Sequence, residues 1–234
     1  ITPSGVRGIS LSIYLRNKAP PDDLDDLPAI ARSLALSFDH HACITGQDLW
    51  AQAVRAYLAG ISFMDAQIGR LLQALDASPH ARNTVVVLWS DHGFHLGEKF
   101  HWHKQALWER STHIPFLIGG AGAGTVGGRV FSAVSLVDLF PTLTELCGVP
   151  RPLQLSGRSL VPLLRDPRKP WDHPVLIERE GGHRAVRSNE WRYIRYADGS
   201  EELYDHRVDP QEWRNLAPFS KYSSVKAELA RHFP

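Results

Sequence analysis

The chain has 234 residues, 43% of them hydrophobic, which suits one α/β domain with a core and leaves room for a small appended lobe. Its 26 Lys and Arg nearly balance 25 Asp and Glu, and a formal net charge of +1 excludes a bulk attraction to nucleic acid or to an anionic membrane. No stretch approaches the roughly 18 consecutive apolar residues of a membrane span, so we expect a soluble chain, whether cytoplasmic, periplasmic or secreted.

The first predicted elements are a connector and a long helix. The chain starts at Ile1, and its only methionine is Met64, so we expect a processed chain or a piece of a longer one. Residues 19–28, APPDDLDDLP, are rich in Pro and Asp and are predicted to form a surface connector. From Asp48 to Leu75, apolar residues recur at steps of three and four, which predicts an amphipathic helix with one buried face.

Two short apolar runs follow this helix. NTVVVLWS (residues 83–90) and HIPFLIGG (residues 113–120) are each typical of a central parallel strand that is covered on both faces. SLVDLFPTLTELCGVP (residues 135–150) then predicts a helix that stops at Gly148. The order of helix, strand, loop, strand and helix predicts a doubly wound α/β layer.

The sequence changes in character from Pro174 onward. HPVLIERE, HRAVRSNEWRYIRY and EELYDH read as alternating strands, joined by turns at Ser188-Asn189 and Asp198-Gly199. A small antiparallel sheet is therefore predicted, with a terminal helix over residues 224–232. We divide the chain at this change, into a main α/β domain (residues 1–170) and a small α+β subdomain (residues 171–234).

Five of the 12 histidines lie in WSDHGFHLGEKFHWHKQALWE, residues 89–109. Asp91 and His92 come directly after a predicted strand, where ligands gather in open α/β sheets. A carboxylate supplies a hard oxygen ligand and an imidazole a nitrogen ligand, so the pair is a candidate for a metal site. The alternative is an aspartate that only caps the next turn.

The residues after this pair extend the candidate site. Gly93 and Gly97 bracket a turn that needs unusual backbone angles, and Glu98 is expected to brace it. Lys104 would meet an anionic ester as a compact point charge, unless it is a solvated surface lysine.

Histidines raise a further alternative, because His101 and His103 form an H-x-H pair close to His92 and His95. No cysteine joins them and no HExxH frame is present, which disfavours zinc. His103 is a candidate catalytic group, and His101 and Trp102 are candidates for the substrate mouth, with packing at the rim as the alternative for Trp102.

Five blocks carry a resemblance to a known family: YLAGISFMDAQIGRLLQAL, NTVVVLWSDHGFHLGE, WHKQALWERSTHIPFLI, SLVDLFPTLTELCGVP and WRYIRYADGSEELYDHRVDPQEWRNLA. In this order they resemble a sulfatase of the alkaline-phosphatase-like superfamily, close to the iduronate-2-sulfatase and choline-sulfatase branches. The resemblance implies an α/β/α sandwich, here partial, followed by the small sheet. It also implies a divalent cation, calcium or another such as magnesium, bound by Asp91 and His92, and a sulfate contact at Lys104. The substrate it implies is a sulfated small molecule or sugar.

The nucleophile that the resemblance implies is not present in the sequence. Such sulfatases convert the first residue of a Cys or Ser followed by x-Pro-x-Arg into formylglycine, and CGVPR (residues 147–151) has its proline displaced by one. The early aspartates and the histidine that complete such a site are also missing. We therefore expect the carboxyl-terminal portion of a sulfatase, catalytically silent without the missing amino-terminal segment. The alternatives are a non-catalytic binding module and a phosphate or phosphonate ester hydrolase.

Overall fold

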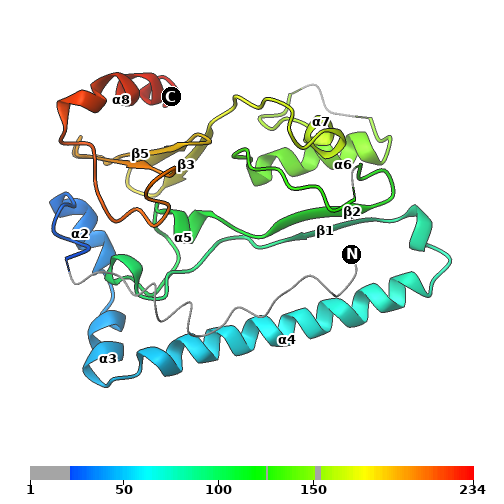
Figure 1. The fold of residues 1–234 in the computed structure, drawn as a ribbon, viewed down its shortest axis with the longest axis horizontal. Helices are drawn as coiled ribbons and strands as arrows, with labels where there is room; N and C mark the ends of the chain where they lie inside the picture. Colours follow the sequence, from blue (N-terminus) through cyan, green and yellow to red (C-terminus); the bar gives the residue numbers. More distant parts are fainter. Residues whose placement is uncertain (1–21, 125, 151–153) are drawn as a thin grey trace.

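The computed structural model describes residues 22–124, 126–150 and 154–234. A long helix and a two-stranded sheet run side by side in Figure 1, two shorter helices lie beyond this sheet, and a four-stranded sheet with the terminal helix occupies the other end of the molecule. The helices are α2 (Ala29–Ala35), α3 (His40–Gly46), α4 (Trp50–Asp76), α5 (Glu109–Thr112), α6 (Leu139–Leu146), α7 (Val161–Arg165) and α8 (Ser223–Ala230). The strands are β1 (Val85–Trp89), β2 (Phe116–Gly120), β3 (Val175–Arg179), β4 (His183–Arg187), β5 (Trp191–Arg195) and β6 (Glu201–Asp205).

Helix α4 confirms the prediction from residue periodicity, but the predicted burial of its face is wrong over most of its length. Its first turns are covered, since Val54 packs with Leu96 and Trp102. Farther along, Ile61, Met64 and Leu71 are 45%, 54% and 70% exposed. None of the described helices has both the length and the hydropathy of a bilayer span.

Strands β1 and β2 lie where apolar runs were predicted, but they pair antiparallel, with Val85 opposite Gly120 and Trp89 opposite Phe116. The prediction of parallel, doubly covered strands is wrong because residues 90–115 return as a loop with a short 3₁₀ turn and the four-residue helix α5 instead of a crossover helix. No residue of either strand is buried, and Trp89 and Leu117 are 48% and 45% exposed.

Helix α6 follows the predicted helix signals. The Ser135 side chain accepts from the amide of Val137, and the carboxylate of Asp138 accepts from the amide of Ser135, so a capping box begins this segment. The helix ends at Leu146, and Gly148 follows with φ of +65°, a left-handed angle that glycine adopts at low cost. The predicted stop at Gly148 is confirmed.

The carboxyl-terminal sheet confirms the prediction from alternating residues. Its strands lie in the order β3-β4-β5-β6, all neighbours are antiparallel, and helix α8 follows. One face packs on α2 through Ala31, Ala185 and Ile194. The other face packs on the segment that includes α8, through Val186, Tyr193 and Leu229. Both faces of the sheet are therefore covered.

The acidic segment before α2 is not a surface connector in its described part, residues 22–28. Asp23 is buried, where its carboxylate pairs with the ammonium group of Lys99 at 2.7 Å and accepts from the Lys99 amide. The carboxylate of Asp26 accepts from the amide of Asn215 at 2.6 Å. The prediction is wrong because both partners lie far away in the sequence, 76 and 189 residues distant.

Candidate active site

Asp91 and His92 lie just beyond the carboxyl end of β1, which ends at Trp89. The Asp91 side chain is 80% exposed, and its Oδ2 lies 3.5 Å from Nε2 of His92. Nδ1 of His92 is 2.7 Å from the carbonyl oxygen of Gly93. Because a carbonyl can only accept, Nδ1 donates in this contact, which leaves Nε2, on the side of the Asp91 carboxylate, as the nitrogen available to a metal ion.

These two side chains fit one side of a divalent-cation site. Asp91 offers carboxylate oxygens that no other described residue binds, and His92 offers the Nε2 lone pair. A ligating histidine commonly donates its second N–H to a backbone carbonyl, as His92 does to Gly93. Two ligands are fewer than the six to eight that Ca²⁺ takes, so further oxygen ligands have to come from outside this pair.

The loop after the pair folds back on itself through three main-chain hydrogen bonds. The amides of Gly93, His95 and Gly97 donate to the carbonyls of Ser111, His103 and His101 at 2.8, 3.1 and 2.9 Å. Lys104 follows His103 directly, so the main chain of the loop returns this lysine toward the strand end that carries Asp91 and His92.

The two glycines of the loop serve different needs. Gly97 has φ of +108°, as predicted, and a Cβ atom there would lie 2.0 Å from the Trp50 ring. Gly93 does not have a positive φ; a Cβ atom there would lie 2.0 Å from the carbonyl oxygen of Arg110. The prediction of an unusual backbone angle at Gly93 is therefore wrong. Glycine is required there because the backbone of Arg110 approaches too closely for a side chain.

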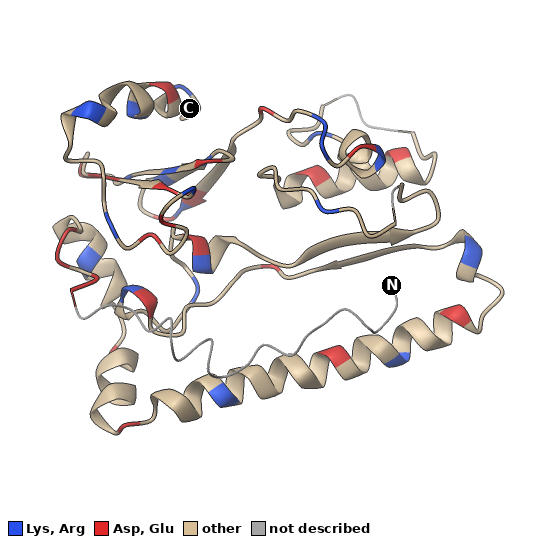
Figure 2. Cartoon of the chain, in the orientation of Figure 1, with Lys and Arg blue, Asp and Glu red and all other residues tan. Residues whose placement is uncertain are grey.

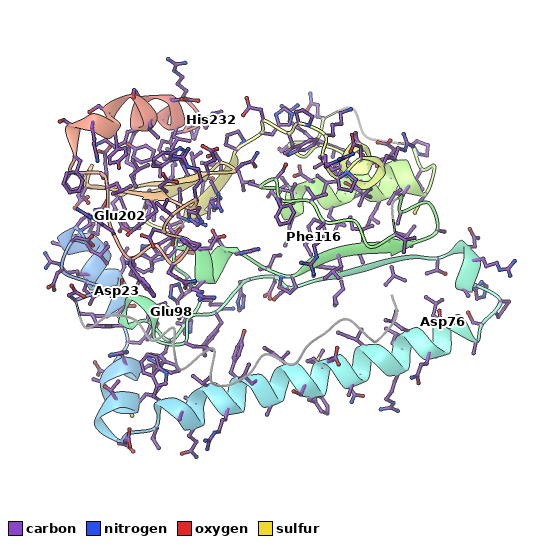
Figure 3. All side chains as sticks on the ribbon, in the orientation of Figure 1. Asp23, Asp76, Glu98, Phe116, Glu202 and His232 are labelled. Atoms are coloured by element: carbon purple, nitrogen blue, oxygen red, sulfur yellow. The ribbon has the colours of Figure 1, made fainter. Side chains whose placement is uncertain are left out.

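Glu98 braces the loop, as predicted. Its buried carboxylate accepts from the amide of Leu96 at 2.7 Å and pairs with Nε of Arg110 at 3.1 Å. Figure 3 shows Glu98 in the loop with Asp23 near it, and the adjacent Lys99 forms the ion pair with Asp23. The turn is thus tied both to α5 and to the segment before α2.

The other predicted site residues differ in how accessible they are. His101 and Trp102 are buried; both ring nitrogens of His101 contact carbonyls, and the indole N–H of Trp102 donates to His41. This burial favours packing over substrate contact for both. His103 is half-buried and stacks on Phe38 with ring centroids 5.0 Å apart. Its catalytic role stays a prediction.

Lys104 is half-buried, and its ammonium group has no hydrogen bond or ion pair to any of the described residues. Its carbonyl is held instead, by Nε2 of His101 at 3.0 Å and Nδ1 of His103 at 3.1 Å. A fixed backbone with an uncommitted ammonium group suits a residue that binds an anion.

His95 has the chemistry of a zinc ligand, but it belongs to no group of three or more possible ligands among the described residues. Burial lowers the pKa of its imidazole well below the usual value, so the ring is neutral, and Nδ1 bonds to the Glu98 carbonyl at 3.1 Å. Among residues that the structure describes, the histidines of the loop do not gather into a group of three or more metal-binding side chains.

A different group of possible ligand atoms does lie within 4.8 Å, from Glu109, His206 and Glu212. Both carboxylates are already neutralised, because the guanidinium of Arg192 pairs with each of them and that of Arg187 pairs with Glu109. Although burial acts to raise it, bonds from His113, Arg192 and Arg187 hold the pKa of Glu109 far below its usual value. Two arginines balance two glutamates, so this group is an ion-pair network and not a cation site.

Comparison with protein families decides the identity of the chain. The family model described as Sulfatase matches residues 16–149, and the model for the C-terminal region of N-sulphoglucosamine sulphohydrolase matches residues 97–233. The chain belongs to the sulfatase family. The resemblance seen in the sequence blocks is thereby confirmed.

Curated relatives agree with this assignment. The chain is 36% identical over 224 residues to a sulfatase of Formosa agariphila, covering 93% of this chain and 44% of the relative. It is 32% identical over 203 residues to a choline-sulfatase of Rhizobium meliloti, covering 83% of this chain and 39% of the relative. The chain thus spans less than half the length of these sulfatases.

Solved structures with a similar fold include a sulfatase and a phosphonate monoester hydrolase. A 2-O GAG sulfatase superposes with a TM-score of 0.79 at 27% identity, covering 92% of this chain and 50% of that one. A structure in complex with D-glucosamine-2-N,6-O-disulfate superposes with a TM-score of 0.68 at 28% identity, over 78% and 40%. A phosphonate monoester hydrolase of Agrobacterium radiobacter reaches 0.69 at 25% identity, over 79% and 41%.

Sequence reasoning missed the residues that hold this part of the sulfatase fold together. Arg192 and Glu202 lie inside strands β5 and β6, and both are buried. A signal was present, since the two-residue period puts Arg192 on the face of Ile194 and Glu202 on the face of Tyr204. A charged residue on an apolar face of a strand predicts a buried charge that has hydrogen-bond or ion-pair partners.

Proposed function

We propose that this chain is the part of a sulfatase that supplies one side of the cation site, through Asp91 and His92, and the sulfate contact, through Lys104. The observation that carries the proposal is the pair at the end of β1, where an exposed carboxylate and a histidine Nε2 lie 3.5 Å apart. The reaction is hydrolysis of a sulfate monoester. We take the cation to be Ca²⁺, with Mg²⁺ or another divalent ion as the alternative.

The electrostatics of the reaction suit these residues. A sulfate monoester has a delocalised negative charge, and its hydrolysis needs positive groups set around the sulfuryl oxygens before charge moves to the leaving oxygen. A bound divalent cation supplies part of that field. Asp91 and His92 hold the ion, and the Lys104 ammonium binds a sulfuryl oxygen as a compact charge. The Glu98 bonds keep the loop that carries Lys104 folded.

The attacking group is proposed to come from a segment that this sequence does not contain. No Cys or Ser followed by x-Pro-x-Arg occurs in the 234 residues, and Cys147, the nearest match, is exposed after α6. A formylglycine in the missing amino-terminal segment would supply the nucleophile. By itself, the chain is then expected to turn over no ester.

The exposed apolar surface of α4, β1 and β2 supports this partner. Ile61, Leu71, Trp89 and Leu117 are 45%, 70%, 48% and 45% exposed, and a two-stranded sheet is marginal without further strands. The sulfatase of Formosa agariphila is more than twice as long as the matched region, which covers 44% of it. We assign the missing sulfatase segment as the occupant of this surface.

The substrate class is proposed to be a sulfated sugar. Its support is that one similar structure binds D-glucosamine-2-N,6-O-disulfate and another is a 2-O GAG sulfatase. A second candidate, a phosphonate ester hydrolase, is favoured by one observation, the similarity to the enzyme of Agrobacterium radiobacter. The same cation and lysine would serve either anion.

The test uses the full-length protein, with the segment that carries the nucleophile, and 4-nitrophenyl sulfate against 4-nitrophenyl phosphate and a phenylphosphonate ester. Asp91→Ala should abolish cation-dependent turnover, and Lys104→Ala should lower kcat/KM on the order of 10²-fold, as loss of one charge-stabilising group does. The exposed residues Asp172 and Lys169 give the matched controls Asp172→Ala and Lys169→Ala. Wild-type rates in both site variants would remove the assignment, and faster phosphonate hydrolysis would favour the second candidate.

A further inference from the structure

His101 connects two parts of the chain through both of its ring nitrogens. Nδ1 lies 2.9 Å from the carbonyl oxygen of Ala35, the last residue of α2, and Nε2 lies 3.0 Å from that of Lys104. The side chain is buried. His101 therefore bridges the end of helix α2 and Lys104, the residue proposed to bind sulfate. In the sequence it lies 66 positions from Ala35 and three from Lys104.

Both partners of this ring are hydrogen-bond acceptors. A carbonyl oxygen has no proton to donate, so both contacts are hydrogen bonds only when both ring nitrogens carry one. A neutral ring would turn one lone pair toward a carbonyl in a buried place, which costs free energy. The carbonyl of Ala35 is also among the unsatisfied groups at a helix end, where a positive group is favourable.

The rest of the contacts of the His101 ring are with imidazoles. Apart from the two carbonyls, the ring lies against two imidazoles, that of His95 with the ring centroids 5.2 Å apart and that of His103 with the centroids 6.1 Å apart. Burial lowers the pKa of His95 well below its usual value, and the positive charge of His101 adds to that lowering. His95 thus stays neutral beside the charged ring. The carbonyl of Lys104 also faces Nδ1 of His103.

We propose that His101 is a positioning residue for Lys104: its doubly protonated ring fixes the Lys104 carbonyl to the end of α2 and so aims the ammonium group at the substrate. This inference rests on the proposed function of Lys104. It gives His101 a role that needs no contact with substrate, in keeping with its burial. A lysine side chain is flexible, so a fixed backbone is what limits the positions its ammonium can reach.

A matched pair of variants separates the two hydrogen bonds. The amide nitrogen of asparagine is two bonds from Cβ, as Nδ1 is, and that of glutamine is three bonds away, as Nε2 is. His101→Asn should therefore keep the bond to Ala35 and lose that to Lys104, and His101→Gln should do the reverse. Each variant loses one buried hydrogen bond, so a purely structural role predicts equal effects.

The experiment measures kcat and KM for 4-nitrophenyl sulfate in the full-length protein, together with urea unfolding. We expect both variants to unfold at similarly lowered urea concentrations, while His101→Asn loses about 10-fold to 100-fold in kcat/KM and His101→Gln stays within about 3-fold. In a Lys104→Ala background, His101→Asn should lower the rate no further. Equal activities of the Asn and Gln variants would overturn the inference. His232→Gln, at an exposed position, is the control.

Two further readouts keep the outcomes distinct. If Lys104→Ala retains full activity, the proposed function fails; if it loses activity and the two His101 variants behave alike, only the positioning role fails. Should His101→Asn not fold, the ¹⁵N spectrum of the wild-type His101 ring decides. Two protonated nitrogens at neutral pH support the inference, and one unprotonated nitrogen overturns it.

Discussion

The carboxyl-terminal sheet and the region of α4, β1 and β2 differ in how far their apolar side chains are covered. In the sheet, Ile194, Leu203 and Tyr204 are fully buried, and each face packs on a neighbouring segment. Along α4, Met64 and Leu71 are more than half exposed. Among the described residues, a finished core thus surrounds the carboxyl-terminal sheet, while α4, β1 and β2 leave apolar side chains uncovered; the finished core includes Trp108, at the end of the site loop.

Charge shows the same contrast. Figure 2 shows charged residues of both signs gathered about the carboxyl-terminal sheet and α5, while α4 carries few. Glu202 lies within this sheet in Figure 3, fully buried, and its carboxylate accepts from Trp108, Tyr196 and Tyr204. The buried charges of this region have partners, and these partners offset the free-energy cost of removing a charge from water.

Substitution of Arg192 is expected to give the largest loss of stability in this region. Its guanidinium donates to Glu109, Glu212 and the carbonyl of Leu107. Arg192→Met would leave the buried carboxylate of Glu212 and the half-buried carboxylate of Glu109 without that partner, and we expect a loss of about 3–5 kcal/mol in the free energy of unfolding. Arg207→Met is the control; that side chain is 51% exposed, so its loss should stay within about 1 kcal/mol. Urea unfolding of the 234-residue chain checks both, and equal losses would contradict the network.

Trp108 ties the site loop to the sheet and should have the next largest effect. Its indole N–H donates to the Glu202 carboxylate at 2.7 Å. Trp108→Phe keeps an aromatic ring but removes this bond to a charged group, so we expect a loss of about 1.5–3 kcal/mol beyond that of the control. Trp213→Phe is matched, since the buried Nε1 of Trp213 bonds to none of the described residues. Similar unfolding free energies in the two variants would mean that the Trp108 bond contributes little.

High pH should weaken the same region by a smaller step. Burial raises the pKa of Tyr193 to about 12, and burial together with Glu202 raises the pKa values of Tyr196 and Tyr204 well above 10. The unfolded chain then loses these protons first, so stability is present below pH 10 and falls as pH rises toward 12. Each tyrosine contributes at most about 1.4 kcal/mol per pH unit. Urea midpoints measured from pH 9 to 11.5 check this.

Tyr193→Phe is the variant that sharpens the pH prediction. It removes one titrating group whose hydroxyl bonds to Glu201, and should make the fall with pH less steep. Tyr222→Phe is the control, because the Tyr222 hydroxyl does not bond to Glu201 or Glu202, as those of Tyr193, Tyr196 and Tyr204 do. A slope that is unchanged by Tyr193→Phe would show that Tyr193 titrates alike in the folded and unfolded chain.

Local patterns in the sequence predicted the carboxyl-terminal sheet and the position of Asp91 and His92 at the end of a strand. Alternating residues and the Asp198-Gly199 turn specify the hairpins, and the position of Asp91 follows from where an apolar run ends. The burial of Asp23 could not be read in this way, because its partner Lys99 is brought close only by the fold. The pairing direction of β1 and β2 likewise depends on how residues 90–115 return, which no local pattern encodes.

The uncovered helix gives the smallest expected effect on stability. Leu71 is 70% exposed, so Leu71→Lys in the 234-residue chain should change the unfolding free energy by no more than about 0.5 kcal/mol. It should still lower self-association, measured by sedimentation velocity over a range of concentrations, because exposed apolar surface favours contact between chains. Leu203→Ala, in the finished core, is the contrast and should cost about 2–5 kcal/mol. If Leu71→Lys instead costs more than about 1 kcal/mol, the chain itself covers this face, and no missing segment is needed to do so.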